Sequence, residues 1–240
     1  MSYSTSIKSI GLLFLSVLFL SGCGMMNQPL PATYETIPVS AKSTDIPIYK
    51  AGHQLQGKPY IFWNFCKQKQ KQLELESPET SPDSLIYRIW ITNQGGARAR
   101  PHALPEIRKD TSGWHGQLVL MHVDFYVNSI RETIRDSKIY TLKPAHLSWD
   151  SIAFKLAEFK YDSLPTDDDI PGYHANEGYD TNTPTFSFEY ATQTQYRFYQ
   201  YADIDRVPDK FWQARNVINI LDLLEEEFHW DKLGRSYFNP

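Results

Sequence analysis

The sequence predicts an α+β fold, a mainly antiparallel sheet with two or three helices packed on one of its faces. The prediction rests first on the order of the elements, which runs strands, helix, hairpin, helix along the chain. It also rests on an amphipathic helix near the C-terminus. The apolar stripe of that helix must lie on another apolar surface, and the apolar faces of the strands supply one.

The first strands are predicted from apolar and alternating runs. Tyr60–Phe65 and Leu85–Thr92 are expected to be buried strands. Gln94–Gly113 is rich in Gly, Arg and Pro and is expected to be a long loop. Asn128–Lys138 stays open between a short helix and a hairpin turn. The stretch Gln117–Val127 alternates and predicts a strand with one fully apolar face, formed by Val119, Met121, Val123, Phe125 and Val127.

Two helices and a hairpin follow. Ser148–Lys160 is predicted to be a helix, with Ser148 as its N-cap and Asp150 near the positive end of its dipole. Thr185–Ala191 and Gln195–Tyr201 alternate aromatic and polar residues and predict a hairpin. The C-terminal helix is expected to begin near Pro208 and Asp209. Its apolar stripe is expected to consist of Phe211, Ala214, Val217, Ile218, Leu221, Leu224 and Phe228.

Composition excludes several classes of protein. The 240 residues include 28 acidic and 24 basic side chains, and 14% of the residues are aromatic. Such a chain has the apolar and aromatic side chains that a disordered protein lacks. Two cysteines exclude a disulfide-stapled scaffold. The formal charge of −4 is a poor match to a nucleic-acid binder, which needs a basic face.

The N-terminus has the layout of a secretory signal. Lys8 precedes an apolar run from Ile10 to Leu20, and small residues follow it. The run is shorter than the ~18 residues that a membrane-spanning helix needs. The segment Leu20-Ser21-Gly22-Cys23 resembles the lipobox of bacterial lipoproteins. The resemblance implies cleavage between Gly22 and Cys23 and diacylation of the Cys23 thiol.

The resemblance to lipoproteins divides the chain into three parts. Residues 1–22 are expected to be the signal peptide, residues 23–46 a lipidated flexible tether, and residues 47–240 a single globular α+β domain. The tether is rich in Pro, Ser and Thr and has no periodicity. A residue other than Asp after Cys23 implies, by the same resemblance, delivery to the outer membrane with the domain facing the periplasm. A lipid anchor of two or more chains gives stable membrane binding.

Catalytic and metal-binding signals are weak. Common hydrolase, nucleotide-binding and zinc motifs are absent from the sequence, so no catalytic residue, metal or cofactor is predicted. His122 and Asp124 share a predicted strand face, where a carboxylate could orient an imidazole, although a hydrogen-bonded pair is favoured. Asp162, Asp167–Asp169, Glu177 and Asp180 could offer oxygen ligands to Ca²⁺, but their spacing fails the EF-hand pattern and a solvated loop is favoured.

Three further features have competing interpretations. Cys66 ends an apolar segment and is expected to be a small buried residue, with a reactive thiol as the alternative. Lys67–Gln72 is expected to be a solvated loop or strand end, with an anion-binding strip as the alternative. Glu225–Glu227 is expected to be an exposed helix end, with contact to a basic partner as the alternative.

The aromatic residues suggest a binding surface, because Tyr and Trp are enriched at interfaces. The residues considered are Tyr87, Trp90, Trp114, Tyr126, Tyr196, Tyr199 and Tyr201. Sugar stacking or peptide binding is one interpretation, but partly buried sheet aromatics are the favoured interpretation. Beyond the tether, the chain resembles a loose set of uncharacterised bacterial lipoproteins, through the strand Tyr87–Ile91, the Leu164-Pro165 turn, the Tyr196-Arg197 hairpin and the terminal helix.

These observations favour a non-enzymatic lipoprotein that is held at the membrane by its lipid and binds a protein partner, for example as an immunity protein against a toxin. Nucleic acid is not an expected partner. Two alternatives remain open. One is an envelope hydrolase that uses His122 and carboxylates, and the other is a structural accessory of outer-membrane assembly.

Overall fold

The structure of the chain is a computed structural model. It describes residues 42–51, 55–93, 99–126, 131–173, 184–202, 204, 210–230 and 232–233. All of them belong to one compact unit, Pro31–Pro240. No helix among these residues has the length and apolar character needed to cross a membrane.

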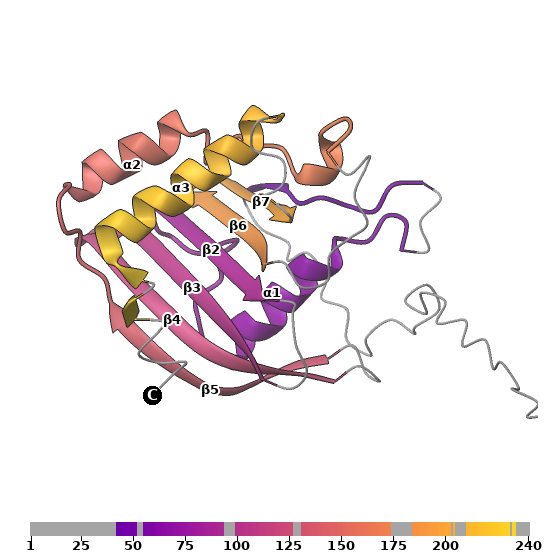
Figure 1. The fold of residues 1–240 in the computed structure, drawn as a ribbon, viewed down its shortest axis with the longest axis horizontal. Coiled ribbons are helices and arrows are strands. Elements are labelled where there is room, and N and C mark those ends of the chain that lie inside the picture. The colour runs from indigo at the N-terminus through magenta and orange to yellow at the C-terminus, as the bar shows by residue number, and fades with distance from the viewer. Residues whose placement is uncertain are drawn as a thin grey trace, which may run out of the picture. The chain divides into compact units, whose positions relative to one another are not determined.

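Within the described residues, seven strands form one sheet, and three α-helices pack on it (Figure 1). The helices are α1 (Ile61–Gln72), α2 (Trp149–Glu158) and α3 (Trp212–Phe228), and a single 3₁₀ turn is formed by Asp167–Asp169. The strands are β1 (Ser43–Asp45), β2 (Leu85–Asn93), β3 (Ala99–Asp110), β4 (Gly113–Tyr126), β5 (Arg131–Thr141), β6 (Pro184–Thr192) and β7 (Gln195–Ala202).

The sheet is mixed but mostly antiparallel. Its strand order is β1-β7-β6-β2-β3-β4-β5, and only β1 runs parallel to its neighbour, β7. The prediction of an α+β protein with a mainly antiparallel sheet is therefore confirmed. Residues 43–45 form strand β1 and are therefore part of the sheet, although the sequence assigns them to the tether.

The helices cover both faces of the sheet. Helices α2 and α3 pack on one face, as predicted, whereas α1, which was expected to be a strand, covers the other face. Alternate residues of β2 explain why. Tyr87 and Ile89 point to the core under α2 and α3, whereas Ile86 and Trp90 point to a second core under α1. Because both faces of β2 are apolar, each face needs a covering layer. Figure 1 shows α2 and α3 on the near side of the sheet and α1 behind it.

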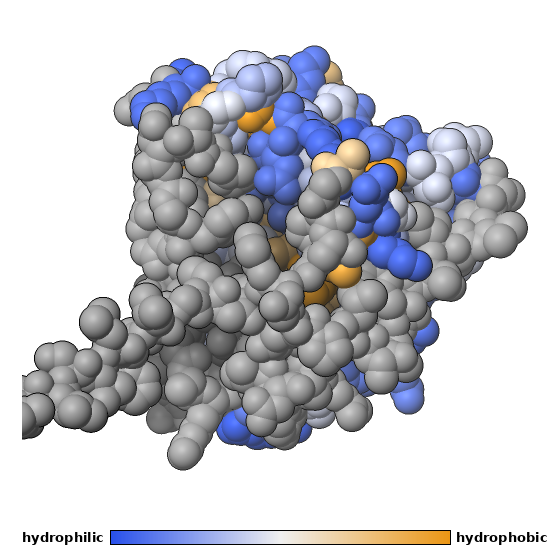
Figure 2. Space-filling model, turned by 90° about the vertical axis from the view of Figure 1, so that its right-hand side faces the viewer, coloured by the Kyte–Doolittle hydropathy of each residue, from blue (hydrophilic) through white to orange (hydrophobic). Residues whose placement is uncertain are grey.

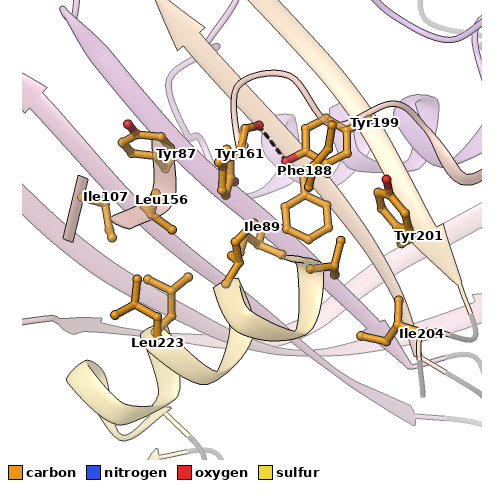
Figure 3. Close-up of a cluster of buried hydrophobic side chains, with 14 of the residues drawn as sticks. Tyr87, Ile89, Ile107, Leu156, Tyr161, Phe188, Tyr199, Tyr201, Ile204 and Leu223 are labelled. Atoms are coloured by element: carbon orange, nitrogen blue, oxygen red, sulfur yellow. Dashed lines mark hydrogen bonds between the residues drawn. The ribbon is translucent and has the colours of Figure 1, made fainter. Parts of the chain in front are cut away.

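The core under α2 and α3 is rich in aromatic side chains that also form hydrogen bonds. Tyr199 Oη donates to the carbonyl of Tyr161 at 2.8 Å, and the ring of Tyr199 stacks on Phe188 (Figure 3). Tyr161 Oη in turn donates to the carbonyl of Arg88 at 2.8 Å. These tyrosines can be fully buried because each hydroxyl has a partner.

The local signals for α2 and the hairpin are confirmed. Ser148 is the N-cap of α2, and its Oγ accepts a hydrogen bond from the backbone N–H of Ser151 at 3.1 Å. Strands β6 and β7 pair as the predicted hairpin. In α3 the buried residues are Ala214, Val217, Ile220, Leu223, Leu224, Glu227 and Phe228, so the buried face differs from the expected stripe at several positions.

Two other predictions of secondary structure are wrong, and a third segment, which the sequence left open, is now resolved. Tyr60–Phe65 is not a strand, because Ile61–Phe65 begins α1. Most of the expected loop Gln94–Gly113 is strand β3. The undecided segment Asn128–Lys138 contributes to strand β5. An apolar run as short as Tyr60–Phe65 fits a buried strand and a buried helix equally well, so its periodicity could not decide.

Candidate functional site

A groove of about 710 Å³ opens at one end of the sheet, beyond the C-terminus of α1. Its floor is formed by two adjacent strands, β3 and β4, one wall by the segment that follows α1, and the other wall by β5. The lining residues are Glu74, Leu75, Glu76, Glu106, Arg108, Trp114, His115, Gly116, Gln117, Ile139, Thr141, Leu142, Lys143, Pro144 and Trp149.

The polar groups of the groove floor are fixed by one another. Glu106 is almost fully buried, and its Oε1 accepts hydrogen bonds from Arg108 Nε at 3.0 Å and from Gln117 Nε2 at 2.9 Å. Its Oε2 accepts from Arg88 Nε at 2.5 Å. Arg108 also reaches Glu76 Oε2 in the wall, at 2.7 Å. The floor is therefore preorganised, because its side chains have little rotational freedom left to lose when a ligand binds.

A buried network of ion pairs lies behind this floor, under α1. Lys67 Nζ contacts Glu79 Oε1 at 2.6 Å and Glu189 Oε1 at 2.7 Å. Arg88 contacts Glu189 Oε2 at 3.4 Å and pairs with Glu106 at the groove. Burial acts to lower the pKa of Arg88, but Glu106 and Glu189 outweigh it and the pKa is raised. The network thus connects α1 to three neighbouring strands, β6, β2 and β3.

Glu189 is the most highly coordinated carboxylate of the network. It also accepts hydrogen bonds from Trp90 Nε1 and from Tyr196 Oη, both at 2.7 Å. Burial acts to raise the pKa of Glu189, but the charges of Lys67 and Arg88 outweigh it and hold the pKa well below its usual range. A carboxylate held in the ionised form by two cations is a poor general acid or base near neutral pH.

Part of the Lys/Gln run belongs to this network, and both predicted interpretations are wrong for that part. Lys67, Lys69 and Gln70 are buried residues of α1. Lys69 Nζ lies 2.8 Å from Glu132 Oε2 and 5.8 Å from the ring centroid of Trp90. Lys67 and Lys69 are neither solvated nor part of an anion-binding strip, because carboxylates from distant parts of the chain neutralise them, whereas Lys71 and Gln72 are exposed.

The structure separates His122 and Asp124. His122 Nδ1 lies 2.9 Å from Asp136 Oδ1 on β5, and Asp124 Oδ1 accepts from Arg135 at 2.5 Å. Each side chain is thus paired across strands to β5. The favoured interpretation, a hydrogen-bonded pair of His122 and Asp124 on a partly wet sheet, is wrong in its pairing, because His122 bonds to Asp136 and Asp124 to Arg135.

Another cluster contains the residue types of a serine hydrolase but not their geometry. His115 Nε2 lies 2.8 Å from Ser112 Oγ and 3.2 Å from Asp110 Oδ1. In a catalytic triad the serine and the carboxylate contact opposite ring nitrogens. Here both contact Nε2, and the Asp110 carboxylate also accepts from the backbone N–H of Ser112 at 2.6 Å, as a turn-forming side chain does.

The acidic loop is built around structural hydrogen bonds. Asp167 is buried, and its Oδ2 accepts from the backbone N–H of Ala202 at 2.9 Å. Asp169 pairs with Lys50 at 2.6 Å. Glu177 and Asp180 lie outside the described residues. Within the residues described, no group of His, Cys, Asp and Glu side chains is arranged to hold a metal ion.

Two remaining candidates serve the fold. Cys66 is buried as predicted, and burial raises the pKa of its thiol to about 12. Glu227 is not an exposed helix end, because its Oε2 accepts from the backbone N–H groups of His146 and Leu147 at 2.9 and 3.0 Å. Burial acts to raise the pKa of Glu227, but these backbone donors outweigh it and the pKa is lowered.

The favoured interpretation of the aromatic residues, side chains buried in the sheet, is confirmed for most of them, and the binding surface is wrong for these. Tyr87, Trp90, Tyr196, Tyr199 and Tyr201 are buried in the two cores. Trp114 is partly exposed, but its ring stacks on Trp149 at 6.3 Å, and Lys109 Nζ lies 4.9 Å from its centroid. The side chain of Tyr126 lies outside the described residues. On the face drawn in Figure 2, the coloured residues are mainly hydrophilic, with small hydrophobic areas between them.

Sequence reasoning missed the residues of the groove floor. Glu106 and Arg108 were missed because β3 was expected to be a loop, and Gln117 was predicted to lie on a strand but not in a site. The alternation of Leu104, Glu106 and Arg108 with Pro105 and Ile107 was the available signal for a strand with a polar face. Gly22 and Cys23, the predicted cleavage and lipidation residues, lie outside the described residues.

Comparison with family models, with curated proteins and with solved structures finds no match to this chain.

Proposed function

We propose that the protein is a membrane-anchored, periplasm-facing lipoprotein that acts as a non-enzymatic binding module, and that the groove beyond α1 receives a segment of a protein partner. The observation that carries the binding role is the preorganised floor of the groove. Glu106, Arg108 and Gln117 are held by one another, so they offer a fixed pattern of polar groups. Such fixed patterns favour recognition, because few side chains need ordering when the partner binds.

The groove also offers groups that are available to a partner. Glu74 is exposed at the end of α1, in a left-handed conformation with φ of 54°. Ile139 and Thr141 present an apolar and a hydroxyl side chain on the opposite wall. A protein segment with basic and apolar side chains matches these walls, because it can pair with Glu74 and pack on Ile139.

The hydrolase alternative has no comparable support among the described residues. His122 and Asp124 are engaged separately by Asp136 and Arg135. The carboxylates behind the groove are paired with Lys or Arg, which stabilises their charged form. The groups of the groove are therefore suited to holding a ligand rather than to moving a proton.

Photo-crosslinking in cells tests the binding role. A photo-crosslinking amino acid replaces His115, which lies in the groove, and in a control chain it replaces Phe154, which is exposed on α2. We expect a discrete adduct with another protein from position 115 and none from position 154. Glu74→Lys should reduce the adduct, because it reverses the charge at the wall without touching the buried network. Equal adducts from both positions, or an adduct indifferent to Glu74→Lys, would refute the role of the groove.

A further inference from the structure

Strand β5 is the last strand of the sheet that the described residues form, and none of their strands pairs with its outer edge, which we call open. It spans eleven residues, Arg131–Thr141. At its start the edge is closed by α1. Gln72 Nε2 donates to the carbonyl of Glu132 at 3.3 Å, and Gln72 Oε1 accepts from the backbone N–H of Ile134 at 2.9 Å. Beyond this point, Ser137, Ile139 and Thr141 are exposed.

The register with β4 identifies which backbone groups face outward. Leu142 donates its backbone N–H to the carbonyl of Gly116 at 2.8 Å, and Tyr140 and Lys138 lie opposite Leu118 and Leu120. In an antiparallel pair, hydrogen-bonded positions alternate along the strand. Lys138, Tyr140 and Leu142 therefore bond to β4, whereas the N–H and C=O groups of Ser137, Ile139 and Thr141 point away from the sheet.

We propose that this open edge pairs with the same edge of a second copy of the chain, antiparallel and centred on Ile139. The centre follows from the edge itself. Gln72 closes the strand up to Ile134, and the strand leaves the sheet after Leu142, so the open stretch runs from about Asp136 to Leu142. Ile139 is its midpoint. A twofold axis through Ile139 uses the whole open stretch and keeps the second copy clear of Gln72.

The side chains of this stretch are complementary to themselves in that register. Ile139, which is 56% exposed, faces Ile139 of the second copy. Ser137 faces Thr141, and such hydroxyl pairs across strands are favourable. Lys138 faces Tyr140, and Lys138 Nζ already lies 4.9 Å from the ring centroid of Tyr140 within one chain. These three pairs join apolar to apolar, hydroxyl to hydroxyl and cation to aromatic ring. At the ends of the stretch Asp136 faces Leu142, so no like charges oppose one another between Asp136 and Leu142.

The pairing would also extend the groove. Ile139 and Thr141 belong to its lining, and they are the residues beside which the second copy's strand would lie. The two grooves would then adjoin across the twofold axis on the α1 face of a continuous sheet. Open edges of this length are templates for further strands, and self-pairing closes them.

Disulfide trapping in the cell envelope tests the pairing directly. The full chain carrying Ile139→Cys is oxidised and compared with a chain carrying Phe154→Cys, which is 66% exposed on α2. The native cysteines are the same in both chains. We expect a covalent dimer from the Ile139→Cys chain and none from the Phe154→Cys chain. No dimer from Ile139→Cys, or equal yields from both chains, overturns the proposal.

A second variant tests the hydrogen bonds. Ile139→Pro removes an N–H that points away from β4, so the ladder between β4 and β5 keeps its bonds. Light scattering of the detergent-extracted full chain should give twice the chain mass for the wild type. The mass should halve in Ile139→Pro, with the circular dichroism spectrum unchanged. A wild-type chain of single mass, or a folded Ile139→Pro chain that stays dimeric, overturns the proposal.

Discussion

Lys67 Nζ lies 2.7 Å from Glu189 Oε1, and the two side chains are 8% and 0% exposed although they lie 122 positions apart in the chain. The pair joins α1 to the middle of the sheet. Tyr196 and Trp90 complete the coordination of Glu189, and Glu79 completes that of Lys67. Because removal of one partner leaves the other charge buried, the position of α1 on the sheet depends on this pair.

The charge of Glu189 should be required for stability. Glu189→Gln keeps the size of the side chain and an oxygen that can accept from Tyr196 or Trp90, but it leaves Lys67 and Arg88 with less compensation. We expect the free energy of unfolding to fall by about 3–5 kcal/mol, the range for breaking a buried ion pair. Urea unfolding followed by circular dichroism measures the change.

Glu158→Gln is the matched control for that substitution. Glu158 is exposed at the end of α2, outside the buried network. The same chemical change there should alter the free energy of unfolding by less than about 0.5 kcal/mol, as surface substitutions generally do. Similar losses in the two variants would contradict a special role for the buried pair.

Stability should also decline in acid. The pKa of Glu189 in the folded chain lies below its value in an unfolded chain, which is about 4.3. The carboxylate therefore contributes stability that is fully present above about pH 4.3 and is lost as the pH falls toward the folded pKa. The melting temperature, measured from neutral to acid pH, should fall once the pH is below about 4. This fall should be smaller in the Glu189→Gln variant. An equally steep drop in Glu189→Gln would assign it to other groups.

The elements that the sequence predicted correctly carry their signals locally. In α2, the N-cap Ser148 and the buried residues Ile152 and Leu156 lie within three turns of one another. They act through a hydrogen bond and through burial inside the same segment. The hairpin of β6 and β7 depends on alternation in two adjacent stretches. Patterns of this kind can be recognised without knowledge of distant contacts.

The elements that the sequence predicted incorrectly depend on partners far along the chain. Lys67 and Glu106 are typical of solvated segments when considered alone. They are buried because Glu189 and Arg88 lie opposite them on strands that no local pattern links to them. The polar floor of the groove was missed for the same reason. A buried charge becomes predictable only when its partner is known.

Gly116 is the tightest backbone position beside α2. A Cβ added there would lie 2.5 Å from Trp149 Cη2 and 3.0 Å from Leu142 Cβ. Gly116→Ala should therefore displace the Trp149 ring from its contacts with Trp114 and Phe228, at a cost of about 1–3 kcal/mol for overpacking. Thermal unfolding measures the loss. In a Trp149→Phe background, which lacks the clashing atom, Gly116→Ala should cost less stability than it does in the wild-type chain. An equal cost in the two backgrounds would contradict the clash.

The lipid anchor is testable at a single sulfur. The proposed lipoprotein depends on Cys23, because acylation of its thiol and cleavage before it require that residue. Cys23→Ser should abolish incorporation of labelled palmitate and leave the precursor uncut, whereas Cys66→Ala should do neither, because Cys66 is buried in the core. Two or more acyl chains anchor a protein stably, so the loss of label should coincide with the loss of the lipid-dependent anchor. If the Cys23→Ser chain is still cut and labelled, the anchor does not lie at Cys23 and the proposed location at the membrane fails.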